Sequence, residues 1–227
     1  MGSDNIVFQV ATWLIPLVFA IVFHEISHGW VANALGDPTA REKGRLSPNP
    51  VRHVDPIGTV ALPLILAVTG GPMFGWAKPV PVVAERLRNP RYGMVLVALA
   101  GPGMNLALAL TAGVALALLQ AAGPEHPGAL LVFLAANLVN FLTINVFLAV
   151  FNLLPIPPFD GGHVVEGLLP RPLAVQYAKL RRLGFALVIF LLLVVPMLFP
   201  HARVIERVVV PPVKLIIGAI VALTGLA

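Results

Sequence analysis

Long apolar runs constrain this chain more than any other feature of its sequence. Residues 5–33, 93–121 and 129–154 are each apolar and long enough to cross the roughly 30 Å hydrocarbon layer of a bilayer as a helix. Charged residues make up only 11% of the chain, whereas a typical soluble domain carries about 25%. The sequence therefore predicts an all-α polytopic membrane protein, a bundle of about five to six transmembrane helices.

Three further apolar segments are shorter. Residues 57–70 are short for a crossing and contain Pro63, which favours a re-entrant hairpin or short strands between the first two core helices. Residues 184–199 and 211–226 are predicted to be C-terminal helices. We expect a single integral-membrane domain over residues 1–227, with a catalytic core at about 5–165 and C-terminal helices at 184–227.

The basic residues indicate an orientation. Twelve of the 15 Lys and Arg residues lie in the polar stretches 34–56, 71–92 and 155–183, and the loop 122–128 has none. If residues 57–70 re-enter, the three basic stretches share one face, which the positive-inside rule places in the cytoplasm with the N-terminus outside. We therefore expect a multi-pass protein of the cell membrane. The net charge of +5 is explained by these loops, so we expect no nucleic-acid partner. The absence of cysteine excludes a thiolate zinc site.

The motif HEISH, residues 24–28, lies near the end of the first apolar run. His24 and His28 are four residues apart, so both imidazoles face one side of a helix and are suited to bind zinc. Glu25 lies beside that face, where it can accept a proton from the attacking water. The alternative is a pair of helix-packing histidines with a glutamate near the interface, but ionisable groups within membrane segments are costly and usually functional.

A third metal ligand is required, and Asp160 is the candidate. It lies in NLLPIPPFDGG, residues 152–162, after three prolines and before two glycines. The backbone is therefore stiff before the carboxylate and permissive after it, which suits an aspartate held at a helix break. A simple turn is the alternative interpretation. Asn152 lies next to this break, whereas the other asparagines of the preceding helix are expected to join helices.

HEISH, AGPGMN (residues 100–105) and NLLPIPPFDGG together resemble the site-two protease family of intramembrane zinc metalloproteases. The stretches GRLSPNPVRHVDPIGT (44–59) and GWAKPVPV (75–82) resemble its compact branch. The loop 122–128 is too short for the PDZ domain of many relatives, and we expect no CBS-type module after the last helix.

The resemblance implies a role for each matching residue. His24, His28 and Asp160 would bind Zn²⁺, and Glu25 would be the general base. Asn152 would contact the substrate backbone or the developing oxyanion. Asn105 is a second candidate for substrate contact, although close helix packing is its simpler interpretation. Residues 44–60 and 71–83 could provide edge strands for an unwound substrate.

The implied function is hydrolysis of peptide bonds within or near transmembrane segments of membrane proteins, at an active site toward the cytoplasmic side. The expected partners are these transmembrane substrates and the lipid bilayer. Two alternatives are open. A metal transporter would also place His and Asp in the membrane, and an inactive relative would bind transmembrane segments without cutting them.

Overall fold

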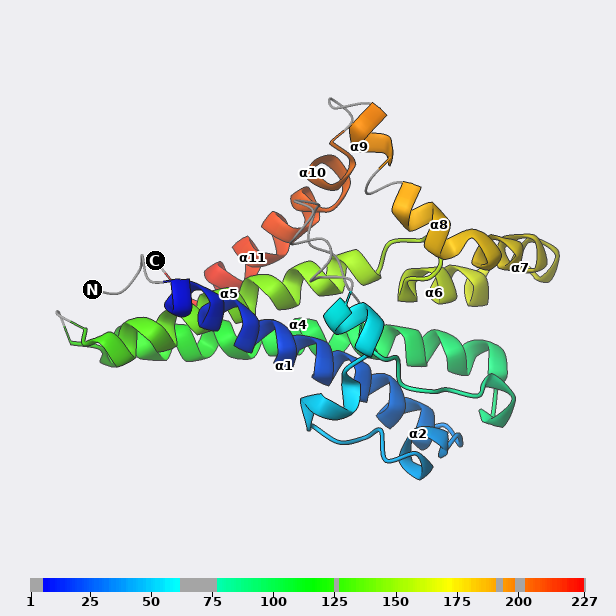
Figure 1. Ribbon diagram of the computed structural model, residues 1–227, viewed down its shortest axis with the longest axis horizontal. Coiled ribbons are helices and arrows are strands. Elements are labelled where there is room, and N and C mark those ends of the chain that lie inside the picture. The colour runs from blue at the N-terminus through cyan, green and yellow to red at the C-terminus, as the bar shows by residue number, and fades with distance from the viewer. Residues whose placement is uncertain (1–5, 62–76, 125–126, 191–193, 199–202, 227) are drawn as a thin grey trace.

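Three long helices dominate the computed structural model (Figure 1). The structure describes residues 6–61, 77–124, 127–190, 194–198 and 203–226. Helices α1 (Ile6–Ala34), α4 (Pro90–Ala122) and α5 (Ala129–Asn152) lie side by side along the long axis of the molecule and pack on one another. Each is long and apolar enough to cross a membrane. The prediction of an all-α membrane protein is confirmed, and the described residues contain no β-strand.

The helices pack through small side chains and expose large ones. Ala109 and Ala112 of α4 are buried against Leu142 and Val146 of α5. The outward faces of all three helices carry exposed Leu, Val, Ile, Phe and Trp side chains. Water would penalise such faces, whereas lipid does not, so this pattern fits helices that lie in a bilayer.

The chain leaves α1 and enters α4 at the same end of the molecule. The backbone N–H of Arg88 donates a hydrogen bond of 2.9 Å to the carbonyl oxygen of Leu35, just beyond α1. Asn89 then caps α4 by accepting a hydrogen bond from the backbone N–H of Tyr92, and Pro90 occupies the first helical position. Residues 57–70, for which the sequence predicts a re-entrant path, lie mostly outside the described residues, so that path stays a prediction.

Short elements follow α1 and precede α4 in the sequence. They are α2 (Thr39–Glu42), the 3-10 turn η1 (Pro50–His53), the π-helical turn η2 (Pro56–Ala61) and the 3-10 turn η3 (Ala84–Arg86). The edge strand expected within residues 44–60 is therefore not formed in the described part. Prolines at 48, 50 and 56 lack the N–H that a strand ladder needs, which explains the turns. Residues 77–83 are not helical, and within the described part of the chain they pair with no strand, although the backbone N–H of Lys78 donates to the carbonyl oxygen of His53.

The chain after α5 is more helical than the sequence predicts. The elements are α6 (Asp160–Leu168), α7 (Arg171–Ala178), η4 (Lys179–Leu183), α8 (Gly184–Ile189), α9 (Val195–Leu198), α10 (Val204–Val208) and α11 (Val210–Thr224). The helix expected at 184–199 corresponds to α8 and α9, and residues 191–193 between them lie outside the described part. The helix expected at 211–226 is α11, which packs on α4 and α5. The single-domain boundaries stay a prediction.

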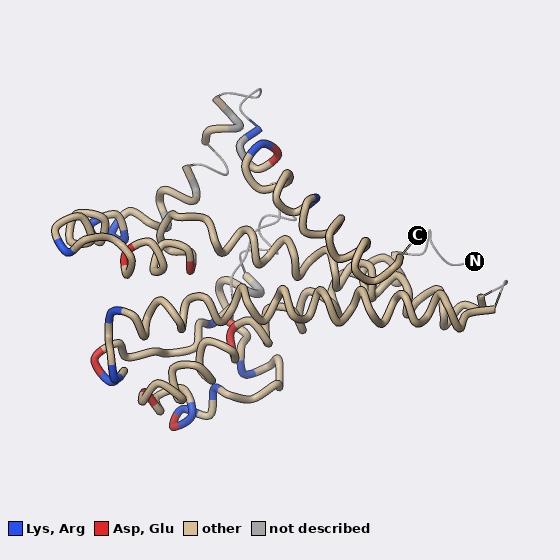
Figure 2. The backbone as a smooth tube through the Cα atoms, turned by 180° about the vertical axis from the view of Figure 1, so that it is seen from behind, with Lys and Arg blue, Asp and Glu red and all other residues tan. Residues whose placement is uncertain are grey.

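Charged residues gather at one end of the long helices. Figure 2 shows the coloured Lys, Arg, Asp and Glu positions over α2, the segment before α4, and α6 and α7, far from both chain termini. The other charged residues of the described chain include Glu25 on α1, those in the loops between α1 and η2, and a group on α10 and at the start of α11. A concentration of basic residues at one end of an apolar bundle fits the charge bias of membrane proteins.

Candidate metal centre

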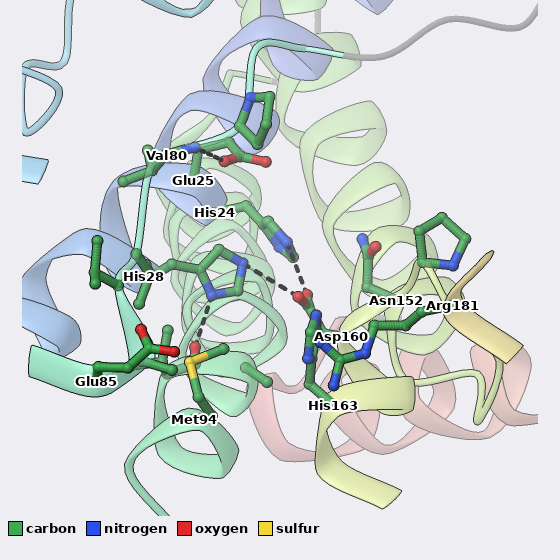
Figure 3. Close-up of a pocket in the computed structure, with 17 residues that line it drawn as sticks. His24, Glu25, His28, Val80, Glu85, Met94, Asn152, Asp160, His163 and Arg181 are labelled. Atoms are coloured by element: carbon green, nitrogen blue, oxygen red, sulfur yellow. Dashed lines mark hydrogen bonds and ion pairs between the residues drawn. The ribbon is translucent and has the colours of Figure 1, made fainter. Parts of the chain in front are cut away.

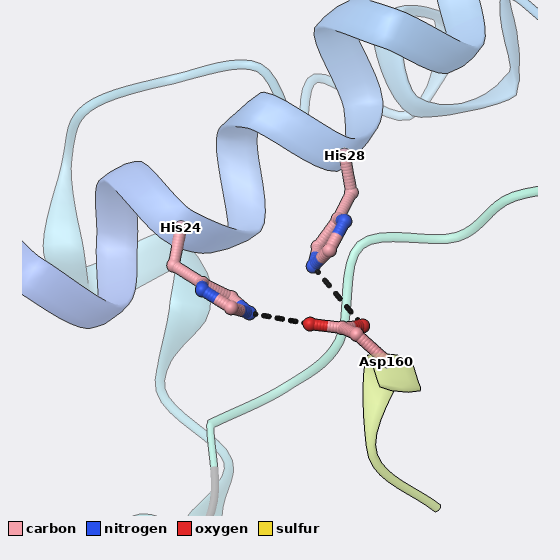
Figure 4. Close-up of side chains that lie close together, drawn as sticks. All are labelled: His24, His28 and Asp160. Carbon is pink, nitrogen blue, oxygen red and sulfur yellow. Dashed lines mark ion pairs between the residues drawn. The ribbon is translucent and has the colours of Figure 1, made fainter. Parts of the chain in front are cut away.

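His24 and His28 come together with Asp160 at the charged end of the bundle. Both histidines lie on α1 and are buried, at 6% and 9% exposure. The Nε2 atom of His24 lies 3.1 Å from Asp160 Oδ2, and that of His28 lies 3.5 Å from Asp160 Oδ1 (Figure 4). Residues 24 and 160 are therefore neighbours in space, as the resemblance implies.

The turn between α5 and α6 explains the position of Asp160. Asp160 is the first residue of α6, and the two glycines after it pack against the proline-rich turn. A Cβ atom on Gly161 would overlap the carbonyl oxygen of Leu153, and one on Gly162 would lie 2.9 Å from the nitrogen of Pro157. Glycine at both positions lets the start of α6 fold back on the turn, so that the carboxylate faces α1.

The three side chains fit a zinc ion. One ligand atom from each of the three residues can be chosen so that all lie within 4.8 Å of one another. Tetrahedral zinc with bonds of about 2.0–2.1 Å places its ligand atoms roughly 3.3 Å apart, close to the two distances above. Asp160 Oδ2 is buried and has no hydrogen-bond partner among the described residues. A buried carboxylate oxygen without a donor is costly, so a cation is a suitable partner for it.

The outer nitrogens of both imidazoles face acceptors. His24 Nδ1 lies 2.5 Å from Asn105 Oδ1, and His28 Nδ1 lies 2.7 Å from the carbonyl oxygen of Val97. Each acceptor requires a hydrogen on Nδ1, which leaves the Nε2 lone pair of the neutral ring directed at Asp160. Electron-rich atoms thus converge from three residues, as a cation site requires.

Glu25 lies beside these three residues, on the next position of α1. Its Oε2 atom accepts a hydrogen bond of 2.8 Å from the backbone N–H of Val80, in the extended segment 77–83. This bond holds the carboxylate at the wall of the cavity, where Figure 3 shows it near His24. The sequence did not reveal Val80 as its partner, because backbone contacts between distant segments leave no residue pattern.

A cavity of about 610 Å³ adjoins the histidine pair. Its walls include His24, Glu25, His28, Asn152 and Asp160, so five of the six predicted site residues share it. Asn152 donates to the carbonyl oxygen of Leu148, one turn earlier in α5.

Asn105 is the predicted site residue that does not line the cavity. It is fully buried behind His24. The structure thus places it against a candidate ligand, away from the space open to a substrate.

Three other charged or titratable side chains line the cavity, Glu85, His163 and Arg181, and none of them was among the predicted site residues. Arg181 pairs with Glu166. Burial, followed by the nearby Arg181 charge, lowers the pKa of His163 from its usual value of 6.5, so this imidazole is neutral near pH 7. The sequence feature that could have indicated His163 as a cavity residue was its position three residues after Asp160.

A bundle of apolar helices with an HExxH helix and a converging aspartate defines a class, the membrane metalloproteases. Comparisons with known proteins give the same class. The family model described as Peptidase family M50 matches residues 125–195. YwhC of Bacillus subtilis is 38% identical over 182 residues, which cover 80% of this chain and 79% of YwhC.

Two further relatives come from distant organisms. Rip2 of Mycobacterium tuberculosis is 34% identical over 188 residues, 82% of this chain and 67% of Rip2. MJ0611 of Methanocaldococcus jannaschii is 31% identical over 165 residues, 70% of this chain and 73% of MJ0611. All three carry names that mark them as candidate zinc metalloproteases. No solved structure is a significant match.

The chain therefore belongs to peptidase family M50, the site-two proteases. It is a membrane metalloprotease, and proteins of this family use zinc.

Proposed function

We propose that this protein cleaves peptide bonds within or near transmembrane segments of membrane-protein substrates, from an active site toward the cytoplasmic side. His24, His28 and Asp160 hold the zinc ion in this proposal. The observation that carries it is the convergence of two Nε2 atoms on the Asp160 carboxylate, beside Glu25 and at the end of a membrane-type helix.

Glu25 is the general base in this proposal. Bound zinc would polarise the scissile carbonyl and lower the pKa of water toward about 7. Glu25 accepts a proton as the water oxygen bonds to the carbonyl carbon, and it passes a proton to the amine nitrogen as the carbon–nitrogen bond breaks. The hydrogen bond from Val80 occupies Oε2 and leaves Oε1 for this transfer.

Asn152 contacts the substrate backbone or the developing oxyanion. Its side-chain nitrogen carries two hydrogens, and the bond to Leu148 uses one of them. The second is available to an oxygen in the cavity that Asn152 lines. A donor at this position stabilises negative charge that grows on the carbonyl oxygen.

The substrate must be unwound before it is cut, because an α-helix uses its carbonyl oxygens in hydrogen bonds to residues four positions later. Transmembrane segments with helix-weakening residues are therefore the expected substrates. The extended residues 79–83 supply wall residues of the cavity, among them Val80 and Val82, and offer a place for an unwound segment to lie alongside.

The proposal is tested with purified protein in proteoliposomes that contain a model transmembrane peptide. We expect cleavage with zinc and none after a chelator removes it. Glu25→Gln should lower the cleavage rate by about 10²–10⁴-fold and keep bound zinc, since Glu25 is not one of the three converging residues. Glu206→Gln is the matched control, because Glu206 is exposed on α10 and pairs with Arg203.

Other outcomes would refute the proposal. Zinc uptake into the vesicles without peptide cleavage would identify a transporter. Binding of the peptide that is the same in wild type and Glu25→Gln, with no cleavage by either, would identify an inactive binder.

A further inference from the structure

One face of α4 supports both histidines of α1. Val97, Gly101 and Asn105 are four residues apart, so they form a stripe along one side of the helix. The Val97 carbonyl accepts from His28, and Asn105 accepts from His24. Gly101 lies between them, where a Cβ atom would come within 2.5 Å of both imidazole rings. The stripe therefore contacts both rings, with Val97 and Asn105 at the Nδ1 atoms and Gly101 beside the Cε1 atoms.

Asn105 is held in one orientation. Its side chain is fully buried, and its Nδ2 atom donates to the carbonyl oxygen of Ala20 at 3.3 Å and to Asn145 Oδ1 at 2.7 Å. With the amide nitrogen used in this way, only Oδ1 can face His24. An oxygen there accepts a hydrogen from Nδ1 and excludes the tautomer with its hydrogen on Nε2.

Asn145 fixes Asn105 in turn. It is also fully buried, and its Nδ2 atom donates to the carbonyl oxygen of Phe141, at 2.8 Å, within α5. A backbone carbonyl can only accept, so the amide of Asn145 must present its oxygen to Asn105. A chain of hydrogen bonds therefore runs from the carbonyl oxygen of Phe141 through Asn145 and Asn105 to His24. Because this carbonyl can only accept, it sets the donor and the acceptor in each later bond of the chain.

We propose that Asn105 is a positioning residue for zinc binding and that Asn145 is its support. Together they keep the hydrogen of His24 on Nδ1 and direct the Nε2 lone pair at the metal position. This inference rests on the proposed zinc site. Hydrogen-bond partners of metal-binding histidines typically change metal affinity by about 10–100-fold when removed.

Comparison with the other asparagines of α5 separates this role from simple helix joining. Asn140 donates to the carbonyl oxygen of Thr12 and so joins α5 to α1. Asn137 donates to the carbonyl oxygen of Phe133 within its own helix. Of these asparagines, only Asn145 forms a hydrogen bond, within the described part of the chain, with a side chain that contacts His24.

The test measures zinc affinity of the purified full-length protein by competition with a chromophoric chelator. Asn105→Leu keeps the side-chain volume and removes the acceptor, and we expect its zinc affinity to fall about 10–100-fold. Asn145→Leu should lower the affinity less. Because Asn145 acts through Asn105, the double variant should match Asn105→Leu and not show the product of both effects.

Asn140→Leu is the matched control, because it removes a partly buried interhelical amide that contacts Thr12, twelve residues before His24 on α1. It should lower the thermal stability of the zinc-free protein and leave zinc affinity unchanged. Asn105→Asp is the conservative variant. It retains an oxygen acceptor for His24, so its zinc affinity and the visible absorption of its cobalt-substituted form should stay closer to wild type than those of Asn105→Leu.

Several results would overturn the inference. If Asn105→Leu and Asn140→Leu lose zinc affinity equally, Asn105 acts only in helix packing. The same conclusion follows if neither variant loses zinc affinity. If Asn105→Leu does not fold, unchanged affinity in Asn145→Leu refutes the role of the pair. Failure of the proposed function is distinguishable, because wild type would then bind zinc and cut no peptide.

Discussion

Gly101 shows how one missing side chain shapes the candidate site. The sequence AGPGMN contains two glycines, Gly101 and Gly103, and glycine is typical of close helix packing in membrane proteins. In the structure only Gly101 of the two allows a close contact, and its neighbours are the imidazole rings of His24 and His28. Gly103 is exposed, and a Cβ atom there would have no neighbour within 4 Å. A motif of small residues does not reveal which of its positions faces the partner.

This difference provides a prediction with an internal control. Gly101→Ala would place a Cβ atom within 2.5 Å of both imidazole rings and displace them from their positions beside Asp160, so we expect loss of zinc binding and of cleavage, and a cost of about 1–3 kcal/mol from overpacking. Gly103→Ala should keep both properties and raise stability by roughly 0.5–1 kcal/mol, because alanine favours a helix interior. Zinc competition and thermal unfolding of the two variants measure this. Equal behaviour of the two would contradict the packing described here.

The short elements after α1 are organised by a buried carboxylate that was not predicted. Asp37 is fully buried, accepts from the backbone N–H and the hydroxyl of Thr39, and accepts from the backbone N–H of Val83 at 2.6 Å. It therefore ties the end of α1 to the extended segment that also contacts Glu25. Burial raises the pKa of Asp37, but these hydrogen bonds together outweigh it and hold the pKa below its usual value of 3.8.

Asp37→Ala should therefore remove the hydrogen bond that holds residues 77–83 against the end of α1. Removing an ionised acceptor from a buried site costs about 1.5–3 kcal/mol, and cleavage should fall because Val80 no longer holds Glu25. The pH dependence follows from the lowered pKa. The stabilisation from Asp37 is complete above about pH 3.8 and is lost as the pH falls through the lower folded value.

The measurement compares thermal unfolding of wild type and Asp37→Ala at a series of pH values. The difference in stability should be constant from neutral pH down to about pH 4 and shrink below it. Glu42→Gln is the control, because its ion pair with Arg86 is exposed and contributes little. A difference that grows toward acid pH would contradict the ionised role of Asp37.

At the scale of the whole molecule, the sequence predicted what depends on local pattern. Helices α1, α4 and α5 follow from apolar runs, and the pairing of His24 with His28 follows from helical spacing. The meeting of Asp160 with these histidines did not follow from the residues alone, because it depends on how α5 and α6 pack. It was inferred by resemblance. Helices α6 and α7 were missed because they are only 9 and 8 residues long, and because glycines follow Asp160 at the start of α6 and a proline lies in the first turn of α7.

The path between α1 and α4 decides the topology of the whole chain. The end of α1 contacts the start of α4 through Leu35 and Arg88, and Arg91 at the start of α4 donates to the carbonyl of Gly167 in α6. The three basic stretches therefore lie at one end of the bundle. We propose that this end is cytoplasmic and that the loop 122–128 is outside.

The chain contains no cysteine, so single cysteines report this topology without background. Lys43→Cys, Arg182→Cys and Gly128→Cys all place the thiol at exposed positions. In intact cells a membrane-impermeant maleimide should label only Gly128→Cys, and the other two should react after permeabilisation. If residues 57–70 crossed the bilayer instead, positions 43 and 182 would lie on opposite faces, since α4 and α5 each cross once between them. Labelling of one but not the other in intact cells would therefore refute the re-entrant path, whereas reversal of all three would refute only the orientation.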